Sequence, residues 1–213
     1  MNDIVKNFQN IRFSINNSNV NIIAVSKTFT LDKIKPLIDF GHKHFGENKV
    51  QEAKDKWLNV KQNNPNLRLH MIGKLQTNKV KDAIKLFDYI HSVDNEKLAS
   101  ALAKCENSAG KKNKYFIQVN IGNETQKSGI NIDKLSDFYS FCKKISLNVI
   151  GLMCIPPNDK NPKKYFIEIA KLNKSLKLDQ ISMGMSHDFQ EAIQYGSTFI
   201  RIGSAIFGDR VIK

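Results

Sequence analysis

The chain has 213 residues, a formal net charge of +13 and 41% hydrophobic residues. This size and composition indicate a single globular domain, residues 1–213, whose core needs no disulfide or metal, and three widely separated cysteines fit neither kind of site. No signal-peptide pattern and no apolar run of about 20 residues is present, so we expect a cytoplasmic protein without membrane contact.

The first element expected is a helix, because Ile4, Phe8, Ile11 and Ile15 recur at helical spacing. Eight short apolar segments then predict strands at 21–26, 44–46, 69–72, 89–93, 115–121, 148–153, 180–182 and 199–202. Helix signals lie between them, over 31–40, 95–107 and 133–145.

The strands begin about 25 residues apart, which is the length of one strand and one helix with short loops. Eight such units predict an α/β fold, a single (β/α)8 TIM barrel. An open doubly wound sheet is the alternative. In a barrel, the functional groups lie where strands end and the following loops begin.

Lys27 ends the first apolar segment. Alternation along a strand places Val25 and Lys27 on one face, so Lys27 faces the barrel interior if Val25 does. An amine in an apolar pocket has a lowered pKa, and the neutral amine can attack a carbonyl group to form a Schiff base. The alternative is a surface lysine that merely ends the strand.

The last strand carries a second candidate group, Arg201. Ile200 and Ile202 share one face of this strand, while Arg201 and Gly203 share the other. An arginine that points into a barrel core needs a ligand or a carboxylate as partner, because an unpaired buried charge is costly. A structural ion pair is the other interpretation of Arg201.

The loops around the last two strands are candidates for phosphate binding. Gly203 and Ser204 begin a turn whose backbone N–H groups, at a helix start, could hold a phosphate, and the segment 182–188 supplies two hydroxyls beside it. After the second strand, Asn48 is either a helix N-cap or a ligand-facing amide. His70 could be a core histidine, and the histidines and cysteines lack the spacing of metal ligands.

At these residues the sequence resembles a known family, the pyridoxal phosphate (PLP) homeostasis proteins, which are similar to the N-terminal barrel of alanine racemase and its fold type III relatives. The resemblance lies in six stretches in the family's order. They are AVSKT (24–28), FGENKVQE (45–52), HMIGKLQTNK (70–79), QVNIGNETQKSGI (118–130), GLMCIP (151–156) and SMGMSHDFQEAIQYGSTFIRIGSAIFG (182–208).

The resemblance implies that PLP is the cofactor and that Lys27 holds it as a Schiff base. It also implies that Arg201 faces the pyridine nitrogen, that Asn48 lies near the ring, and that the phosphate is bound by Ser182, Gly203 and Ser204. The sequence departs from the family's pattern at Lys49, Lys74 and Cys154. None of these departures removes an implied PLP contact, although Lys74 adds a charge near the pocket mouth.

The resemblance further implies a monomeric, non-catalytic protein of intracellular PLP (vitamin B6) homeostasis, whose partners are PLP and PLP-dependent apoenzymes. Arg201 stays protonated and cannot readily give a proton to the pyridine nitrogen, which makes the ring a poor electron sink. The alternative is a PLP-dependent amino-acid racemase. Racemisation needs acid and base groups on both faces of the substrate. Because the chain ends at Lys213, we expect the second domain that supplies one of them to be absent.

The basic charge also raises the hypothesis of a nucleic-acid-binding protein. Of the 33 basic residues four are Arg, which leaves 29 Lys spread along the chain among many Asn and Ile residues. Codon bias in an AT-rich genome would produce this composition, and no aromatic stacking motif accompanies it. We therefore expect a solvated basic surface and no nucleic-acid partner.

Overall fold

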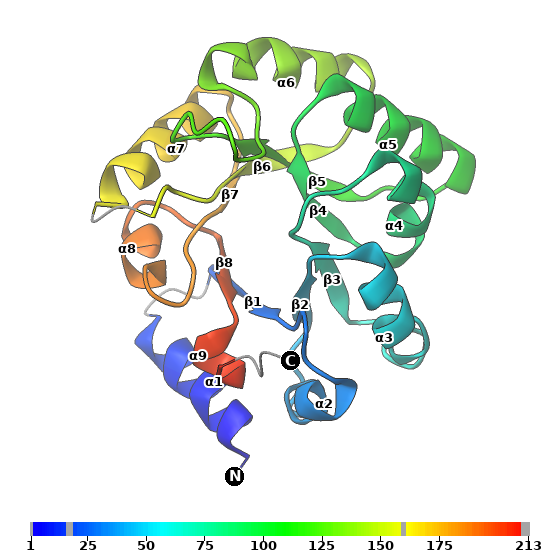
Figure 1. The fold of residues 1–213 in the computed structure, drawn as a ribbon, viewed down its shortest axis with the longest axis vertical. Coiled ribbons are helices and arrows are strands. Elements are labelled where there is room, and N and C mark those ends of the chain that lie inside the picture. The colour runs from blue at the N-terminus through cyan, green and yellow to red at the C-terminus, as the bar shows by residue number, and fades with distance from the viewer. Residues whose placement is uncertain (1, 16–18, 159–160, 210–213) are drawn as a thin grey trace.

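The computed structural model describes residues 2–15, 19–158 and 161–209, and these form a parallel barrel surrounded by helices (Figure 1). The strands are β1 Asn21–Val25, β2 His44–Glu47, β3 Arg68–Met71, β4 Tyr89–Val93, β5 Lys114–Val119, β6 Val149–Cys154, β7 Gln180–Ser182 and β8 Phe199–Ile202. Each strand pairs in parallel with its neighbours in sequence order, and β1 pairs with β8, so the barrel is closed.

The helices cover the outside of the barrel. They are α1 Asp3–Ser14, α2 Leu31–Asp39, α3 Val50–Asn63, α4 Val80–Leu86, α5 Glu96–Ala109, α6 Leu135–Lys144, α7 Lys163–Ser175, α8 Phe189–Gln194 and α9 Ser204–Phe207. Short 3-10 helices, Thr77–Lys79 and Ile132–Lys134, precede α4 and α6. The predicted (β/α)8 barrel is thus confirmed, and the open sheet is not found.

Strand residues alternate between the barrel interior and an outer apolar layer, and β1, β4, β5, β6 and β8 contribute apolar side chains to the interior. The inner layer, inside the barrel, contains Ile23, Tyr89, Phe116, Met153 and Phe199. The outer layer lies between strands and helices and forms the larger core, to which β1 contributes Ile22 and Ala24. Since Ile23 faces inward, Val25 does so as well, as the sequence pattern requires for Lys27.

Local sequence signals explain where individual helices begin and end. The Asn95 side chain accepts a hydrogen bond of 2.9 Å from the backbone N–H of Leu98, as expected of an N-cap, and α5 ends at Gly110 in the left-handed conformation, φ 62°. The helix predicted over 133–145 begins as the 3-10 turn Ile132–Lys134 before it becomes α6. A 3-10 turn at a helix start is common, because it satisfies groups that lack α-helical partners.

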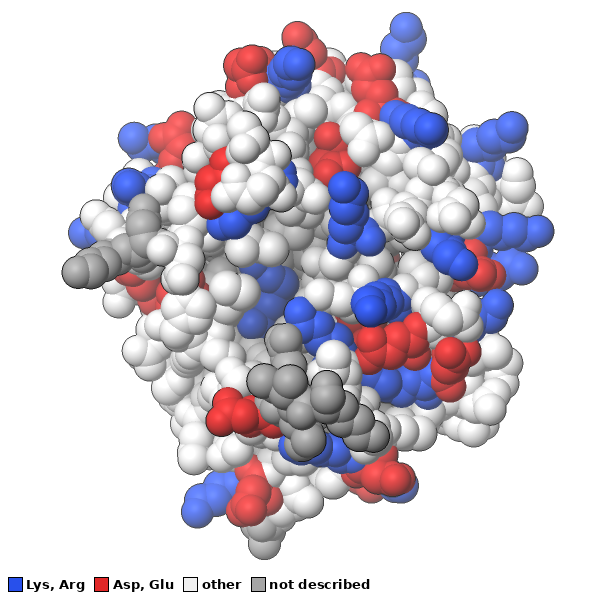
Figure 2. Space-filling view, in the orientation of Figure 1, with Lys and Arg blue, Asp and Glu red and all other residues white. Residues whose placement is uncertain are grey.

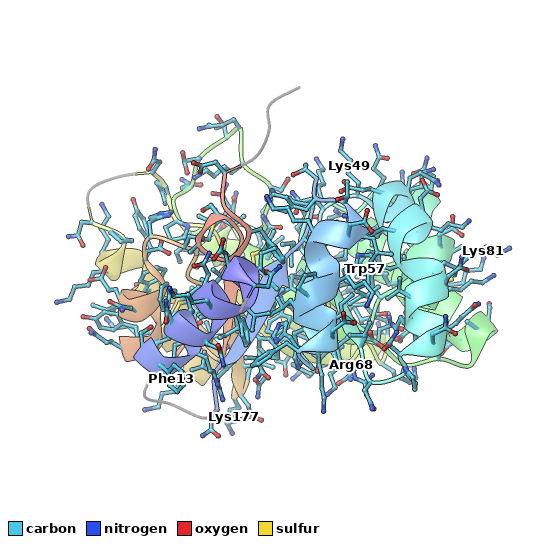
Figure 3. The ribbon with its side chains drawn as sticks, turned by 90° about the horizontal axis from the view of Figure 1, so that it is seen from below. Phe13, Lys49, Trp57, Arg68, Lys81 and Lys177 are labelled. Carbon is cyan, nitrogen blue, oxygen red and sulfur yellow. The ribbon has the colours of Figure 1, made fainter. Side chains whose placement is uncertain are left out.

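The N-terminal helix α1 packs against α9 and α2, outside the seam between β1 and β8. Its Phe8 and Ile11 are buried, as their spacing predicts. In the perpendicular view, Lys49, at the start of α3, lies at the upper end of the barrel, whereas Arg68 and Lys177, which precede or begin strands, lie at the lower end (Figure 3). Among the helices within the described ranges, none is long and apolar enough to cross a membrane.

Candidate functional site

The carboxyl-terminal ends of the strands face the viewer of Figure 1, and we call this end of the barrel the mouth. The space-filling view shows a hollow near the centre of this face, with Lys and Arg side chains in it and around its rim (Figure 2). Two adjoining cavities of about 320 and 890 Å³ lie at the mouth, and both are lined by Lys127 and Ile155. The positions of the predicted site residues can therefore be described relative to these two cavities.

Lys27 lies in the turn that follows β1, two residues beyond Val25, and it is half-buried. The next residue, Thr28, adopts a left-handed backbone conformation with φ 69°. A β-branched residue rarely adopts this conformation, which costs about 1–3 kcal/mol. The Thr28 backbone N–H donates a 2.6 Å hydrogen bond to Oε1 of Glu52, so α3 holds the turn in this shape.

A buried carboxylate behind β1 and β2 anchors the same turn. Oε1 of Glu47 accepts hydrogen bonds from Ser26 Oγ at 2.7 Å, from Trp57 Nε1 at 2.8 Å and from Lys56 Nζ at 3.0 Å. Lys56 also donates to the backbone oxygen of Ser26 at 2.9 Å. Through these bonds, α3 fixes the residue that directly precedes Lys27.

Arg201 points into the barrel from β8 and is 5% exposed. Its Nη1 donates to Ser182 Oγ at 2.8 Å and its Nη2 donates to the backbone oxygen of Cys154 at 2.9 Å. Both acceptors are uncharged, and the structure records no carboxylate within ion-pair distance of Arg201 in the described part of the chain. Of the two interpretations of this arginine, the structural ion pair is thus not found.

Burial determines the protonation of the groups around Arg201. It lowers the pKa of the guanidinium from its ordinary value, and arginine nevertheless remains charged in proteins. Burial raises the pKa of the Cys154 thiol to about 12, which leaves it neutral. A single positive charge therefore sits at the base of the mouth with only neutral groups bonded to it.

Gly203 and Ser204 lie where the sequence predicts a helix start, because Gly203 is the N-cap of α9 and Ser204 its first residue. A Cβ on Gly203 would lie 3.5 Å from Cβ of Val25, so this turn adjoins the end of β1. Ser204 Oγ lies 3.3 Å from Ser186 Oγ, and the Ala205 N–H approaches the same oxygen at 3.5 Å. Two hydroxyls and a helix start thus meet at the mouth.

Ser182 ends its strand where the sequence predicts, but its hydroxyl does not lie beside the other residues predicted to bind phosphate. It is the last residue of β7, fully buried, and its hydroxyl contacts Arg201 and Nδ1 of His91 rather than Gly203 or Ser204. The end of β7 coincides with the end of the strand predicted over 180–182. The phosphate contact of Ser182 stays a prediction that this position does not favour, and Ser186 is the hydroxyl beside Ser204.

Asn48 lines the smaller mouth cavity together with Lys74. It is not the N-cap of α3, since Lys49 holds that position, and the N-cap interpretation is therefore wrong. Gly73 lies against the backbone of Asn48 so closely that a Cβ at this position would overlap it. The remaining interpretation, an amide that faces a ligand, is consistent with this placement.

Some features of the site are not apparent from the sequence. His70 is fully buried, as its interpretation as a core histidine predicts, but its hydrogen bond to buried His91 beneath Arg201 and the anchoring role of Glu47 are not predicted. Ser186 is one of the two hydroxyls expected in the segment 182–188, and it faces Ser204. For the two histidines the available signal is their position in predicted strands, where a polar residue is unexpected. No cluster of three or more potential metal ligands is found in the residues that the structure describes.

Comparison with known proteins agrees with this architecture. Residues 1–211 match the family described as alanine racemase, N-terminal domain. The pyridoxal phosphate homeostasis protein of Vibrio cholerae is 39% identical over 91% of this chain and 86% of its own length. The protein of the same name from Escherichia coli strain K12 is 34% identical over 99% of this chain and 98% of its own.

Solved structures show the same relationship. PipY of Synechococcus elongatus, determined with PLP bound, superposes with a TM-score of 0.89 at 31% identity, covering 96% of this chain and all of that one. An alanine racemase from Clostridium difficile shares the fold, with a TM-score of 0.75 at 17% identity over 99% of this chain and 58% of that chain. The protein therefore belongs to the alanine racemase N-terminal domain family and, within it, to the pyridoxal phosphate homeostasis proteins.

Proposed function

We propose that this protein binds PLP at the mouth of the barrel and serves in PLP homeostasis without catalytic turnover. The observation that carries the proposal is Arg201, a buried cation that is bonded to two neutral acceptors at the base of the mouth. It lies one strand away from the turn that carries Lys27, because β8 pairs with β1. The PLP bound in the related PipY structure supports the choice of ligand.

The residues present fit the chemical groups of PLP. Arginine has only donors, and it matches a pyridine nitrogen that accepts a hydrogen bond. Lys27 offers an amine for covalent attachment of the aldehyde. Gly203, Ser204 and Ser186 offer hydroxyls and backbone N–H groups for the phosphate, and Asn48 faces the same mouth.

The same arrangement explains why turnover is not expected. PLP supplies an electron sink to enzymes that protonate its ring nitrogen. Arginine is not deprotonated in proteins, so Arg201 positions the ring without promoting that chemistry. A holding and supply role, with PLP-dependent apoenzymes as recipients, suits these properties better than the role of a versatile catalyst does.

The test is a titration of the purified protein with PLP, followed by visible absorption before and after borohydride reduction. We expect a new visible band in the wild type, bleached by borohydride with covalent labelling of Lys27. Lys27→Ala should lack both. Lys74→Ala is the matched control, since it removes an exposed lysine at the same mouth, and it should behave as the wild type does.

Labelling of Lys27→Ala equal to that of the wild type would disprove the assignment of the site. A second experiment separates storage from catalysis. Solvent deuterium that enters the α-position of an amino acid, and does so only when Lys27 is present, would establish the racemase alternative. Transfer of PLP from the loaded protein to an apoenzyme is the result expected of a carrier.

We also propose that the protein acts as a cytoplasmic monomer without nucleic-acid or membrane partners. Basic side chains, Lys and Arg, are distributed around the mouth face with acidic residues between them (Figure 2). Salt-sensitive RNA binding that persists in Lys27→Ala would contradict this part of the proposal. Sedimentation of the PLP-loaded protein would test the monomeric state.

A further inference from the structure

A continuous row of hydrogen-bonded side chains runs through the barrel interior below Arg201. Ser182 Oγ, which accepts from Arg201, lies 2.9 Å from Nδ1 of His91. Nε2 of His91 lies 2.9 Å from Nδ1 of His70, and Nε2 of His70 lies 2.9 Å from Nδ1 of His44. We call Ser182, His91, His70 and His44 the histidine column.

The column is held rigidly although its members come from four different strands. His70 stacks on Tyr89 with ring centroids 4.3 Å apart and an interplanar angle of 11°. His91 stacks on Phe116 with centroids 4.3 Å apart and an angle of 19°. Ser182, His91 and His70 are fully buried, and the stacking fixes the planes of the two imidazole rings.

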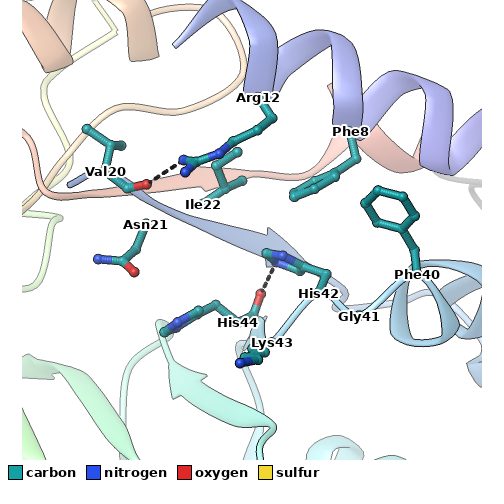
Figure 4. Close-up of a pocket in the computed structure, with 10 residues that line it drawn as sticks. All are labelled: Phe8, Arg12, Val20, Asn21, Ile22, Phe40, Gly41, His42, Lys43 and His44. Carbon is teal, nitrogen blue, oxygen red and sulfur yellow. Dashed lines mark hydrogen bonds between the residues drawn. The ribbon is translucent and has the colours of Figure 1, made fainter. Parts of the chain in front are cut away.

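The lower end of the column reaches a pocket at the opposite end of the barrel from the mouth. This pocket, of about 300 Å³, lies where β1 and β2 begin, and half-buried His44 is one of its lining residues (Figure 4). His42 donates from Nε2 to the backbone oxygen of His44 at 2.8 Å and thereby fixes the start of β2. The column thus connects the Arg201 site with the far end of the barrel.

The donor direction along the column follows from Arg201. Arginine can only donate, so Ser182 Oγ accepts from it, and the one hydrogen of the Ser182 hydroxyl needs a different acceptor. Within the described residues, His91 Nδ1 is its other recorded partner. If His91 donated instead, a buried hydroxyl hydrogen would have no acceptor, which is costly.

Once His91 accepts at Nδ1, every other proton in the column is determined. A neutral imidazole has one donor and one acceptor nitrogen, so His91 donates from Nε2 to His70. His70 then donates from Nε2 to His44, whose own proton is on Nε2. The rings are neutral at pH 7, because burial lowers the pKa of His70 and His91 well below the ordinary value and lowers that of His44 to about 4.

We propose that Ser182, His91 and His70 are positioning residues for Arg201, and that the hydrogen bonds of the column run in one direction from Arg201 to His44. This inference rests on the proposed function only in assigning Arg201 to the pyridine nitrogen of PLP. Hydrogen bonds in such a chain polarise one another, so Ser182 becomes a stronger and better-oriented acceptor for the guanidinium. Loss of Ser182 leaves Nη1 of Arg201 without its acceptor.

The experiment uses NMR of the full chain, labelled with 15N at histidine and arginine, in the ligand-free state. Long-range proton–nitrogen correlations identify which ring nitrogen of each histidine carries the proton. We expect His44, His70 and His91 all to carry it on Nε2. We also expect separate resonances for Nη1 and Nη2 of Arg201, because a held guanidinium does not rotate rapidly.

Ser182→Ala is the decisive variant, and Ser92→Ala is its matched control. Ser92 follows His91 in β4 and is 2% exposed, and its hydroxyl has no hydrogen-bond partner within the described residues. In Ser182→Ala, His91 should no longer be held in a single tautomer and the Nη resonances of Arg201 should merge. PLP binding should weaken at least about tenfold. Ser92→Ala should leave all three unchanged, and Ser182→Thr, which keeps the hydroxyl, should restore them.

Each outcome decides part of the inference. A proton on Nδ1 of any of the three rings in the wild type would overturn the donor direction. Equal effects of Ser182→Ala and Ser92→Ala, or an unchanged Arg201 signal in Ser182→Ala, would overturn the positioning role. If Ser182→Ala does not fold, His44→Leu removes only the last acceptor, far from Arg201. Because the donor direction is determined at the Arg201 end, His70 should keep its proton on Nε2 in this variant, and a proton on Nδ1 of His70 would contradict the column.

The NMR and PLP-binding measurements also distinguish failure of the column from failure of the proposed function. A wild type that fails to bind PLP would disprove the proposed function, while the tautomers and the guanidinium signals of the ligand-free protein would still decide the column. Binding of PLP with a disordered Arg201 would instead leave the proposed function intact and disprove the column.

Discussion

The environment of Arg201 indicates which chemical group of a ligand the site can bind. Its two recorded acceptors are neutral, and within the described ranges no carboxylate lies within ion-pair distance of it, although Asp188 interacts with it at longer range. A hydrogen bond that involves a charged group contributes about 1.5–3 kcal/mol. A ligand that places a hydrogen-bond acceptor against the guanidinium therefore gains the most binding free energy at this site.

We predict that Arg201→Gln weakens PLP binding about 10- to 100-fold, because it removes the charge and shortens the side chain. A fluorescence or absorption titration measures the change. Lys74→Gln provides the comparison, since it removes an exposed charge from the mouth and should change the affinity about fivefold at most. Similar losses in both variants would mean that general charge attraction dominates.

Buried histidines give the protein a defined response to acid. Burial lowers the pKa of His42 to about 3 and that of His44 to about 4, from an ordinary value of 6.5 in the unfolded chain. The charged neighbours of His44, which include Arg68, Asp88 and Lys43, mostly add to this effect. The unfolded chain binds more protons than the folded one between these values, so stability must fall as the pH falls.

We therefore predict that the urea concentration at the midpoint of unfolding is constant above about pH 6.5 and declines steadily toward pH 4. Each histidine that gains a proton only on unfolding contributes a slope of about 1.4 kcal/mol per pH unit. Denaturation curves at intervals of half a pH unit measure it. His44→Gln should flatten the decline, and an unchanged slope in that variant would assign the effect to other groups.

At the scale of single elements, α3 matters because it fixes the turn that carries Lys27. Lys56 and Glu47 form a buried ion pair at 3.0 Å, with the Lys56 side chain 9% exposed and that of Glu47 fully buried. Removing one partner of such a pair is strongly destabilising, by about 3–5 kcal/mol, because a buried charge is left unpaired. We expect Glu47→Ala to lose that much stability and to weaken PLP binding through the loosened turn.

Urea denaturation compares this variant with Asp39→Ala in α2. Asp39 pairs with Lys35 at 2.6 Å, but both side chains are about 60% exposed, so the loss should be about 0–1 kcal/mol. Losses of equal size would show that burial does not govern these pairs. Refolded Glu47→Ala with unchanged PLP affinity would show that Lys27 is positioned by other contacts.

The helices and strands also show which parts of the fold and the site can be predicted from the sequence. Apolar runs at a regular spacing predict all eight strands to within about two residues, and alternation correctly places Arg201 inside the barrel. The histidine column was not predicted, because His44, His70 and His91 come from separate strands. Only the register between β2, β3 and β4 brings them to adjoining positions. The hydrogen bond from Arg201 to Ser182 is not apparent from the sequence for a similar reason, since it joins side chains of two separate strands, β8 and β7.

At the scale of the whole molecule, PLP binding should stabilise the folded barrel, because the site joins β1 to β8. A ligand at 100 times its dissociation constant stabilises a protein by about 2.7 kcal/mol. For a chain of this length, that corresponds to a Tm increase of about 5–10 °C. Thermal denaturation with and without PLP measures the shift, and Lys27→Ala should show a smaller one. An equal shift in the variant would place the binding energy elsewhere.

The pairing of β1 with β8 also has a consequence for biosynthesis. A ribosome makes the N-terminal strand first, and its partner β8 emerges only after six further strands. Until then, the edge of β1 remains open to other strands, and an open edge is a template for aggregation. The strand that carries Arg201 and the turn that carries Lys27 become neighbours only when this seam closes, so an incompletely translated chain cannot assemble the site.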